Sequence, residues 1–200
     1  MNFDIFLVGV GGQGVLTIAE IITDAAFLEN IPVNYFPTEG MAQRGGFVKA
    51  QVRLGRNLAG PNLPDKGSDL IISMEISESL KAVRYIKPGG NFVIWGHTWY
   101  PTAVMLGKAS YPSFEQVKEQ INIAKSRLIF LDPANRPLFK GVPVPENIFT
   151  LGASYQNSPL NQIIKVETLK KAISTKWPKE SERNLASFEA GLESKIGIYA

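Results

Sequence analysis

A cluster of glycines follows the first apolar run of the chain, in the segment LVGVGGQGV at residues 7–15. Glycines in such a strand-to-helix turn allow a tight bend, a close approach of another group to the backbone, and close packing of helix on strand. The start of a helix also offers unpaired N–H groups and the positive end of its dipole, which suit a phosphate. The candidate contacts are Gly9, Gly11, Gly12, Gln13 and Gly14. The same pattern also fits a tight turn that binds no cofactor.

A second glycine-rich segment, TEGMAQRGG, occupies residues 38–46 between two predicted strands, where a short connection would suffice. Loops this rich in glycine with embedded charges are either disordered or shaped for a ligand. The Arg44 guanidinium could bind a phosphate or a carboxylate through two hydrogen bonds, and a solvated surface arginine is the alternative. The predicted contacts are Glu39, Gln43, Arg44, Gly45 and Gly46.

Apolar spacing predicts the elements that position these two segments. A buried strand at 3–8, a helix at 15–28 and a strand at 31–36 form the βαβ pattern that builds parallel sheets. Strict alternation at 47–54 predicts a half-buried strand, as an antiparallel insertion or an edge. Because the first two strands of a wound sheet end at the same edge, we expect the glycine turn and the 38–46 loop to be neighbours.

The rest of the chain continues the alternation of strands and helices. Further strands are predicted at 69–74, 91–95 and 127–131, with a turn at 88–90. Helices are predicted at 77–86, after Ser113 with Gln116 as its capping-box partner, and at 180–192. The predicted fold class is α/β: a Rossmann-like three-layer sandwich with a mostly parallel sheet, an antiparallel insertion, and a helical C-terminal third from about 145 to 200. We expect one domain over residues 1–200.

The composition excludes several classes of function. The net charge is +3 and no basic run stands out, so no nucleic-acid partner is expected. No segment is long and apolar enough to cross a bilayer, and the N-terminus lacks the basic start of a signal peptide. We therefore expect a cytoplasmic protein without a membrane partner. With no cysteine and one histidine, the chain offers no thiolates for an iron–sulfur cluster and no histidine-based metal site.

Other residues with possible chemistry follow predicted strands, and none is predicted to be catalytic. Glu75 lies at the edge where we expect the glycine turn and could make a polar contact there. His97 has no acidic neighbour in the sequence that would orient it as a base. Asp132 is expected to cap or turn the chain. The aromatic residues around His97, which favour a hydrophobic lid or a subunit contact, are Trp95, Trp99 and Tyr100.

Together, GVGGQG at 9–14 and EGMAQRGG at 39–46 resemble the gamma subunit of 2-oxoacid:ferredoxin oxidoreductases, and most closely the small subunit of indolepyruvate-type enzymes. The glycine turn alone is weakly specific, whereas MAQRGG at this distance behind it is specific. The resemblance covers most of the chain: further similar segments are 48–54, 61–64, KPGG at 87–90, YPS at 111–113 and 184–191. Phe47 departs from the pattern, since a small residue is common there, and its ring could narrow the adjacent cleft.

The resemblance implies a subunit of a thiamine diphosphate enzyme of the pyruvate, ketoisovalerate or indolepyruvate type. Such an enzyme decarboxylates a 2-oxoacid oxidatively to an acyl-CoA and passes electrons to ferredoxin. It also implies that thiamine diphosphate, magnesium and the iron–sulfur clusters lie on a thiamine diphosphate-binding subunit and a ferredoxin-like subunit, with coenzyme A as co-substrate. This chain would hold none of these cofactors alone, and its two glycine-rich segments would border the thiamine or coenzyme A cleft.

Two other functions remain open from the residues. The first is an NAD(P)- or nucleotide-binding Rossmann oxidoreductase, which needs an acidic residue for the ribose near the end of the second strand. Glu39 is a poor match, because it lies beyond Pro37. The second is a non-catalytic scaffold subunit whose glycine turn binds nothing.

Overall fold

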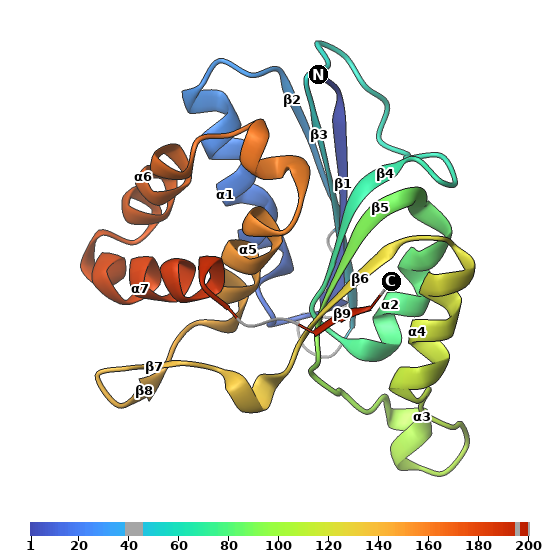
Figure 1. Ribbon diagram of the computed structural model, residues 1–200. Helices are drawn as coiled ribbons and strands as arrows, with labels where there is room; N and C mark the ends of the chain where they lie inside the picture. The colour runs from blue at the N-terminus through green and yellow to red at the C-terminus, as the bar shows by residue number, and fades with distance from the viewer. Residues whose placement is uncertain (39–45, 195–196, 200) are drawn as a thin grey trace.

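A seven-stranded sheet forms the centre of the computed structural model, which describes residues 1–38, 46–194 and 197–199. Among these residues the strand order is β2-β3-β1-β4-β5-β6-β9 (Figure 1). The strands are β1 (Phe3–Val10), β2 (Val33–Thr38), β3 (Phe47–Leu54), β4 (Ser68–Ser73), β5 (Ile86–Trp95), β6 (Arg127–Leu131) and β9 (Gly197–Tyr199). Neighbours from β1 through β4 and β5 to β6 pair in parallel, whereas β3 pairs antiparallel with both β1 and β2, and β9 antiparallel with β6.

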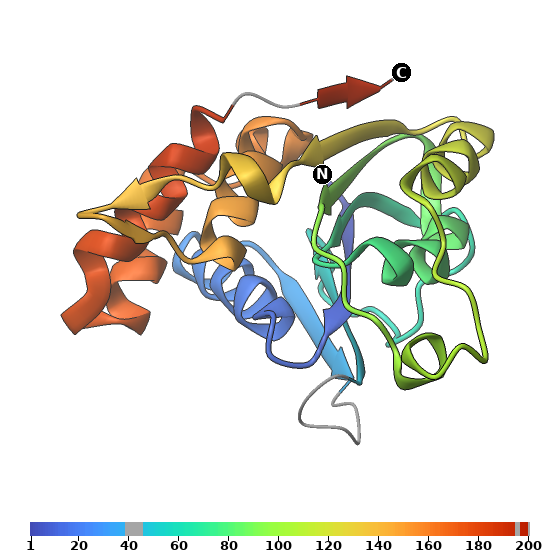
Figure 2. The ribbon, with the colours of Figure 1, turned by 90° about the horizontal axis from the view of Figure 1, so that it is seen from below.

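Helices cover both faces of the sheet, which confirms the predicted three-layer α/β sandwich (Figure 2). The helices are α1 (Val15–Leu28), α2 (Ile76–Ala82), α3 (Thr102–Met105), α4 (Phe114–Ile123), α5 (Glu146–Gln156), α6 (Val166–Lys176) and α7 (Ser181–Leu192). On one face α1 and α5 contact the strands, and α6 and α7 pack outside them; α2 and α4 cover the other face. Short 3-10 helices occupy Val83–Tyr85, Pro133–Asn135, Pro159–Gln162 and Pro178–Glu180, and a small hairpin joins β7 (Leu138–Phe139) to β8 (Val142–Pro143).

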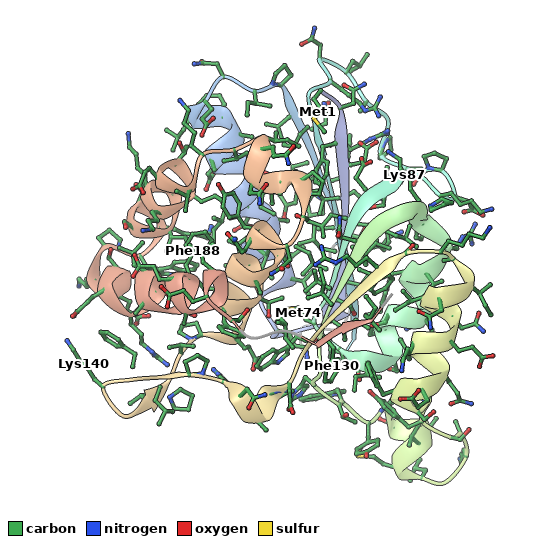
Figure 3. The ribbon with its side chains drawn as sticks, in the orientation of Figure 1. Met1, Met74, Lys87, Phe130, Lys140 and Phe188 are labelled. Carbon is green, nitrogen blue, oxygen red and sulfur yellow. The ribbon has the colours of Figure 1, made fainter. Side chains whose placement is uncertain are left out.

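Two hydrophobic cores, one on each face, hold the layers together. Phe188 of α7 is fully buried among the helices of the α1 face, while Phe130 of β6 packs on the α4 face (Figure 3). Every residue of β1 is buried, as expected for a central strand covered on both faces. The buried acid of this strand, Asp4, is paired with Arg53 at 2.8 Å and with Arg56 at 2.9 Å, so its charge is compensated.

The chain changes face between β1 and β4, and this places the site. From β1 the chain enters α1 on one face and continues to β2, whereas from β4 it enters α2 on the other face and continues to β5. The crevice between the carboxyl ends of β1 and β4 is therefore the topological switch point, where ligands bind in open α/β sheets. Figure 2 shows the molecule from this edge of the sheet.

The predicted antiparallel insertion at 47–54 is confirmed. It is β3, which lies between β1 and β2, so β2 runs in the direction of β1 without pairing to it. As a result β2 is itself an edge strand, and it continues through Pro37, which needs no N–H partner on that side.

The predicted turn at 88–90 is a bulge inside β5, and the predicted helix 77–86 ends at Ala82. Gly89 has φ 79° and donates its N–H to the Lys125 carbonyl at 2.7 Å, so the extra residues leave the ladder without breaking the strand. The C-terminal third is helical as predicted, except that β9 returns to pair with β6.

Candidate functional site

The two glycine-rich segments meet at the carboxyl end of β1. The Gly11 N–H donates to the Gly46 carbonyl at 2.8 Å, and the strands pair up to Val10 opposite Phe47. Since β3 lies antiparallel to β1, the start of β3 has to come beside the end of β1. The expected neighbourhood of the glycine turn and the end of the 38–46 loop is therefore confirmed for Gly46. Four of the predicted contacts, Glu39, Gln43, Arg44 and Gly45, lie outside the described residues.

The glycines of the turn serve different purposes. A Cβ at Gly9 would lie 2.8 Å from Gln13 Oε1 and 3.0 Å from the Met74 Cβ, so Gly9 is needed for close packing. Gly14 has φ 75° and a Cβ there would overlap the side chain of Asn147, at the start of α5. By contrast Gly12, at φ 101°, is exposed, and a Cβ there would meet nothing within 4 Å. Two glycines thus shape the turn, while Gly12 leaves its backbone open.

The side chain of Gln13 folds under this turn. It is buried, with 8% of its surface exposed, and its Oε1 accepts the Val10 N–H at 2.8 Å. The Gln13 main-chain N–H donates to the Val10 carbonyl at 3.1 Å, so side chain and main chain both close the turn on Val10. The amide nitrogen Nε2 is buried and has no hydrogen-bond partner.

The N-terminus of α1 opens beside these groups. Gly14 is its N-cap, no side chain caps it, and no acidic residue lies in its first turn. The first N–H groups of a helix have no acceptor within the helix. The start of α1 therefore presents hydrogen-bond donors and the positive end of the helix dipole, with no acidic residue in its first turn. A group with acceptor oxygens fits this surface.

Glu75 lies at the carboxyl end of β4, as predicted, but its carboxylate is already engaged and 0% of the residue is exposed. One oxygen accepts the Glu78 N–H at 2.8 Å and the Ser77 hydroxyl at 2.7 Å, which caps α2. The other oxygen accepts the Trp99 N–H at 3.0 Å and the Tyr111 hydroxyl. Glu75 therefore fixes the chain around α2 rather than facing the crevice.

Two pKa shifts belong to this cluster. Burial, and then the hydrogen bond to Glu75, raise the pKa of Tyr111, so its hydroxyl keeps the proton that it donates. Burial also raises the pKa of Glu78, against a lowering by its hydrogen bond and ion pair with Lys81. Both groups lie beside the start of α2.

Residues 99–110, which we call the arm, project from the same edge of the sheet, after β5. Every residue of the arm except Val104 is exposed, and α3 within it buries no residue (Figure 1). The exposed fractions of its large apolar side chains are 44% for Trp99, 54% for Tyr100, 69% for Met105 and 62% for Leu106. Glu75 and Tyr111 fix the two ends of the arm, and the Tyr100 ring packs edge-on against Tyr111, with centroids 5.1 Å apart.

The remaining sequence candidates have structural roles. Trp95 is 1% exposed and packs in the core against Phe149, so it does not belong with the exposed aromatic residues of the arm. His97 accepts the Ile76 N–H through its carbonyl, and its ring lies 6.5 Å from that of Trp99. Asp132 caps a 3-10 turn by accepting the Ala134 N–H at 2.9 Å, as expected.

Phe47 lies on the α2 face of the sheet, opposite α1. Its ring packs on the core of that face, and the Lys81 ammonium lies 4.6 Å from the ring centroid. The ring therefore covers the α2 side instead of closing the space at the start of α1. Asn147, which contacts Gly14, was not foreseen, because nothing in the sequence relates two residues so far apart along the chain.

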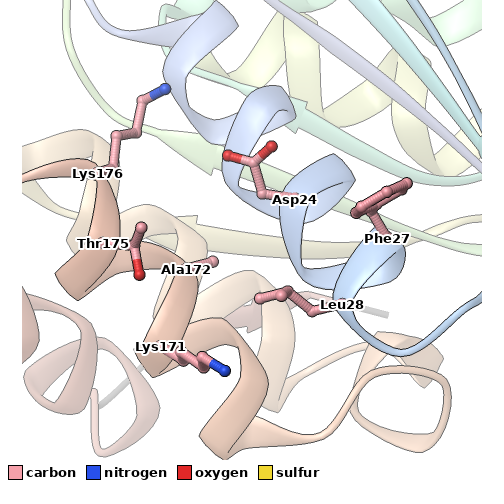
Figure 4. Close-up of a pocket in the computed structure, with 7 residues that line it drawn as sticks. All are labelled: Asp24, Phe27, Leu28, Lys171, Ala172, Thr175 and Lys176. Carbon is pink, nitrogen blue, oxygen red and sulfur yellow. The ribbon is translucent and has the colours of Figure 1, made fainter.

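A separate pocket of about 410 Å³ lies between the end of α1 and α6 (Figure 4). Its lining residues are Asp24, Phe27, Leu28, Lys171, Ala172, Thr175 and Lys176. It lies at the other end of α1 from the glycine turn and contains none of the predicted site residues. The described residues bring together no group of three or more histidines, cysteines or acids that could hold a metal ion. None of the helices in the described ranges is long and apolar enough to cross a bilayer.

Comparisons with known proteins agree with this fold. A family model described as pyruvate ferredoxin/flavodoxin oxidoreductase matches residues 4–194. Indolepyruvate oxidoreductase subunit IorB from Thermococcus kodakarensis is 31% identical over 197 residues, which cover 96% of this chain and 96% of that protein.

Two solved structures are similar in fold. A pyruvate oxidoreductase subunit from Thermotoga maritima has a TM-score of 0.70 at 18% identity, over 100% of this chain and 99% of that chain. The gamma subunit of a keto/oxoacid ferredoxin oxidoreductase from Geobacter sulfurreducens has a TM-score of 0.66 at 20% identity, over 96% of both chains. The matched family model and the relative of similar length show that the chain belongs to the pyruvate ferredoxin/flavodoxin oxidoreductase family.

Proposed function

We propose that this subunit works in a cytoplasmic 2-oxoacid:ferredoxin oxidoreductase, supports the oxidative decarboxylation of a 2-oxoacid to an acyl-CoA, and is inactive alone. The electrons would pass to ferredoxin. The name of the similar subunit from Thermococcus kodakarensis favours an indolepyruvate-type substrate. We also propose that residues 1–200 act as one domain, since the two cores lie on the two faces of one sheet.

The cofactors of the reaction belong to partner chains in this proposal. The chain has no cysteine, so it does not supply the thiolates that iron–sulfur clusters require. The described residues also lack an acidic or histidine cluster for magnesium. We therefore assign thiamine diphosphate, magnesium and the clusters to a thiamine diphosphate-binding subunit and a ferredoxin-like subunit, and coenzyme A to a cleft that this chain borders.

The hydrogen bond from Gly11 to Gly46 is the observation that carries this proposal. It joins the glycine turn to Gly46, directly before β3, at the switch point of the sheet. The glycine turn and the start of α1 offer N–H donors, which suit a phosphorylated cofactor held mainly by another chain. The proposed contacts are Gly9, Gly11, Gly12, Gln13, Gly14, Glu39, Gln43, Arg44, Gly45 and Gly46.

The arm supports dependence on a partner. Contiguous exposed apolar side chains on a water-soluble surface are typical of an interaction site. The arm follows β5 and the glycine turn follows β1, and these strands end at the same edge of the sheet. A partner subunit that covers the glycine turn would therefore extend over the arm. Residues 96–112 contain no acid, and Lys108 is the charged side chain of the arm, so an apolar surface with a carboxylate would complement it.

The proposal is tested by purifying the chain alone and together with its partner subunits. We expect electron transfer from a 2-oxoacid only in the complex, and full activity of the chain alone would overturn the proposal. A Gly12→Val variant then separates a cleft from a scaffold: loss of turnover in an intact complex supports the cleft. The control is Gly89→Val. Gly89 also has a positive φ and open space around it, but it lies near the amino end of β5, away from the carboxyl ends of β1 and β4.

The nucleotide-binding alternative rests on the same open helix N-terminus and needs its own test. The three tryptophans of the chain allow energy transfer to bound NADH to be followed by fluorescence. We expect no saturable transfer in the micromolar range. Saturable binding would favour a stand-alone NAD(P)-dependent oxidoreductase.

A further inference from the structure

A polar pocket of about 380 Å³ lies where the pairing of β5 with β6 begins, beside the end of α5. Asn91 and Arg127 are opposite each other in these strands. Both side chains lie on the α1 face, because Val93 and Ile129, two residues further along each strand, belong to the core of that face. The other lining residues come from the end of α5 and the segment after it: Gln156, Asn157, Ser158, Pro159, Asn161 and Gln162.

The Asn91 side chain is buried without a partner. Only 8% of the residue is exposed, and its carboxamide makes no hydrogen bond within the part of the chain that the structure describes. Parallel strands covered on both faces are apolar, as Val93 and Leu70 are here, so a carboxamide at this position is unusual. Buried polar groups in native proteins are almost always hydrogen-bonded, and Asn91 can both donate and accept, so it calls for a partner in the pocket.

The Arg127 guanidinium gives the pocket its charge. It forms no ion pair with an acid of the described residues, and none of the described lining residues is acidic. Its Nη1 donates to the Asn157 carbonyl at 3.4 Å, which is longer than the roughly 2.7–3.2 Å of an ordinary N–H···O bond. That carbonyl lies at the end of α5, whose dipole supplies only about half a negative charge, so the full positive charge of Arg127 dominates. Most of its N–H donors remain for a ligand.

Two further carboxamides of the pocket offer acceptors. The Asn157 Nδ2 group donates to the Ala153 carbonyl at 2.9 Å, and the Asn161 Nδ2 group donates to the Gln156 carbonyl at 3.2 Å. Among the described residues no donor reaches the side-chain oxygen of either asparagine. The pocket therefore combines one cation with amide donors and amide acceptors. Hydroxyl groups match such a mixture, because a hydroxyl both donates and accepts.

We propose that this pocket binds a small organic anion that carries hydroxyl groups. Its carboxylate or phosphate accepts two hydrogen bonds from Arg127, whose planar guanidinium fits either group. Its hydroxyl groups bond to the carboxamides of Asn91 and Asn157. The volume lies in the range of small-molecule sites, roughly 300–1,000 Å³. The pocket shares no residue with the glycine turn or the arm, so this proposal stands or falls independently of the proposed function.

The test is an NMR titration of the ¹⁵N-labelled full chain with glycerate and with glycerol 3-phosphate, which distinguish a carboxylate from a phosphate. We expect saturable shifts of the Asn91 side-chain amide and the Arg127 Nε–H with at least one of the two, at a Kd of about 1 mM or below. Glycerol lacks the charge and propionate lacks the hydroxyl groups, so both should bind at least about tenfold more weakly. Absence of saturation with both anions would overturn the proposal, as would equal binding of glycerol or propionate.

The first variant is Arg127→Met, which removes the charge and the donors of the guanidinium. We expect the Kd for the bound anion to rise by at least about tenfold, because hydrogen bonds between charged groups are lost. The matched control is Arg183→Met. Arg183 also donates to a backbone carbonyl, that of Pro143 at 2.7 Å, and forms no ion pair with a described acid. An unchanged Kd in Arg127→Met would contradict the proposal.

The second variant, Asn91→Leu, separates binding from a structural role. Leucine has a similar size, and an apolar side chain removes the cost of burying an unpaired carboxamide. We therefore expect Asn91→Leu to unfold at the same urea concentration as the natural chain or a higher one, while the Kd for the anion rises by about fivefold. A variant that loses stability and keeps its affinity would assign Asn91 to the fold and contradict its role in the pocket.

Discussion

Gly11 donates its N–H to the carbonyl of Gly46 at 2.8 Å, which ties the glycine turn after β1 to the residue before β3. The bond continues the antiparallel pairing of β1 with β3 by one step beyond Val10 and Phe47. Gly11 and Gly46, which are far apart in the sequence, therefore lie side by side. The arm, fixed by Glu75 and Tyr111, projects from the same edge.

The anchoring of the arm predicts a cost for Tyr111→Phe. The Tyr111 hydroxyl donates to the buried Glu75 carboxylate and accepts the Ser77 N–H at 3.3 Å. Losing a hydrogen bond to a buried charged group should lower the free energy of unfolding by about 1.5–3 kcal/mol. Urea unfolding of the variant and of the natural chain measures this loss of free energy. Tyr100→Phe is the control, because the Tyr100 ring is half exposed, and a change below about 0.5 kcal/mol is expected there. Equal stabilities of the two variants would contradict the anchoring role.

The raised pKa of Glu78 predicts a pH dependence. Burial makes the folded state bind the Glu78 proton more tightly than the unfolded state does, so this residue lowers stability as pH rises above 4.5, its ordinary pKa. A Glu78→Gln variant lacks this titration. Its free energy of unfolding relative to the natural chain should therefore increase as pH rises through the folded pKa, as measured by urea unfolding from about pH 4 to pH 8. If the difference in free energy of unfolding between Glu78→Gln and the natural chain stays constant or falls over this range, the prediction is contradicted.

The exposed apolar side chains of the arm predict a defect in assembly. Leu106→Asp should weaken binding to the partner subunit by about tenfold or more, because it places a carboxylate in a contact expected to be apolar. Binding is measured by surface plasmon resonance with the purified partner. The control is Leu58→Asp, since Leu58 is 90% exposed and follows β3, which ends beside the start of β1 and therefore away from the arm. Equal affinities for the two variants would remove the arm from the interface.

The sequence was sufficient to predict those helices and strands that are identified by a residue pattern within the element itself. The continuous apolar run of β1, the spacing of α1 and the alternation of β3 each identify one element, and the Ser113–Gln116 capping box is present at the start of α4. These patterns work because burial on one or two faces imposes a fixed period on the chain. The meeting of the two glycine-rich segments followed from the same reasoning about strand ends.

Other features depend on tertiary contacts and leave no local signal. Residues 88–90 were predicted to be a turn, but the pairing of β5 with β4 continues across them, so Gly89 forms a bulge. The short strand β9 exists because the edge of β6 is open to it. Glu75 was predicted to make a polar contact in the crevice, and only the positions of Trp99 and Tyr111 show that its carboxylate is engaged elsewhere. The unpaired Nε2 of Gln13 is likewise visible only once its neighbours are placed.

Hydrogen exchange of the glycine turn, with and without the partner subunits, tests most directly whether another polypeptide completes this surface. We predict that assembly slows exchange in the peptide containing residues 11–16 by at least about tenfold, since the exposed N–H groups around Gly12 become covered. A peptide from residues 56–62, at the opposite edge of the sheet, should exchange at an unchanged rate. Unchanged exchange of residues 11–16 in an intact complex would contradict the proposal that a partner subunit covers the glycine turn.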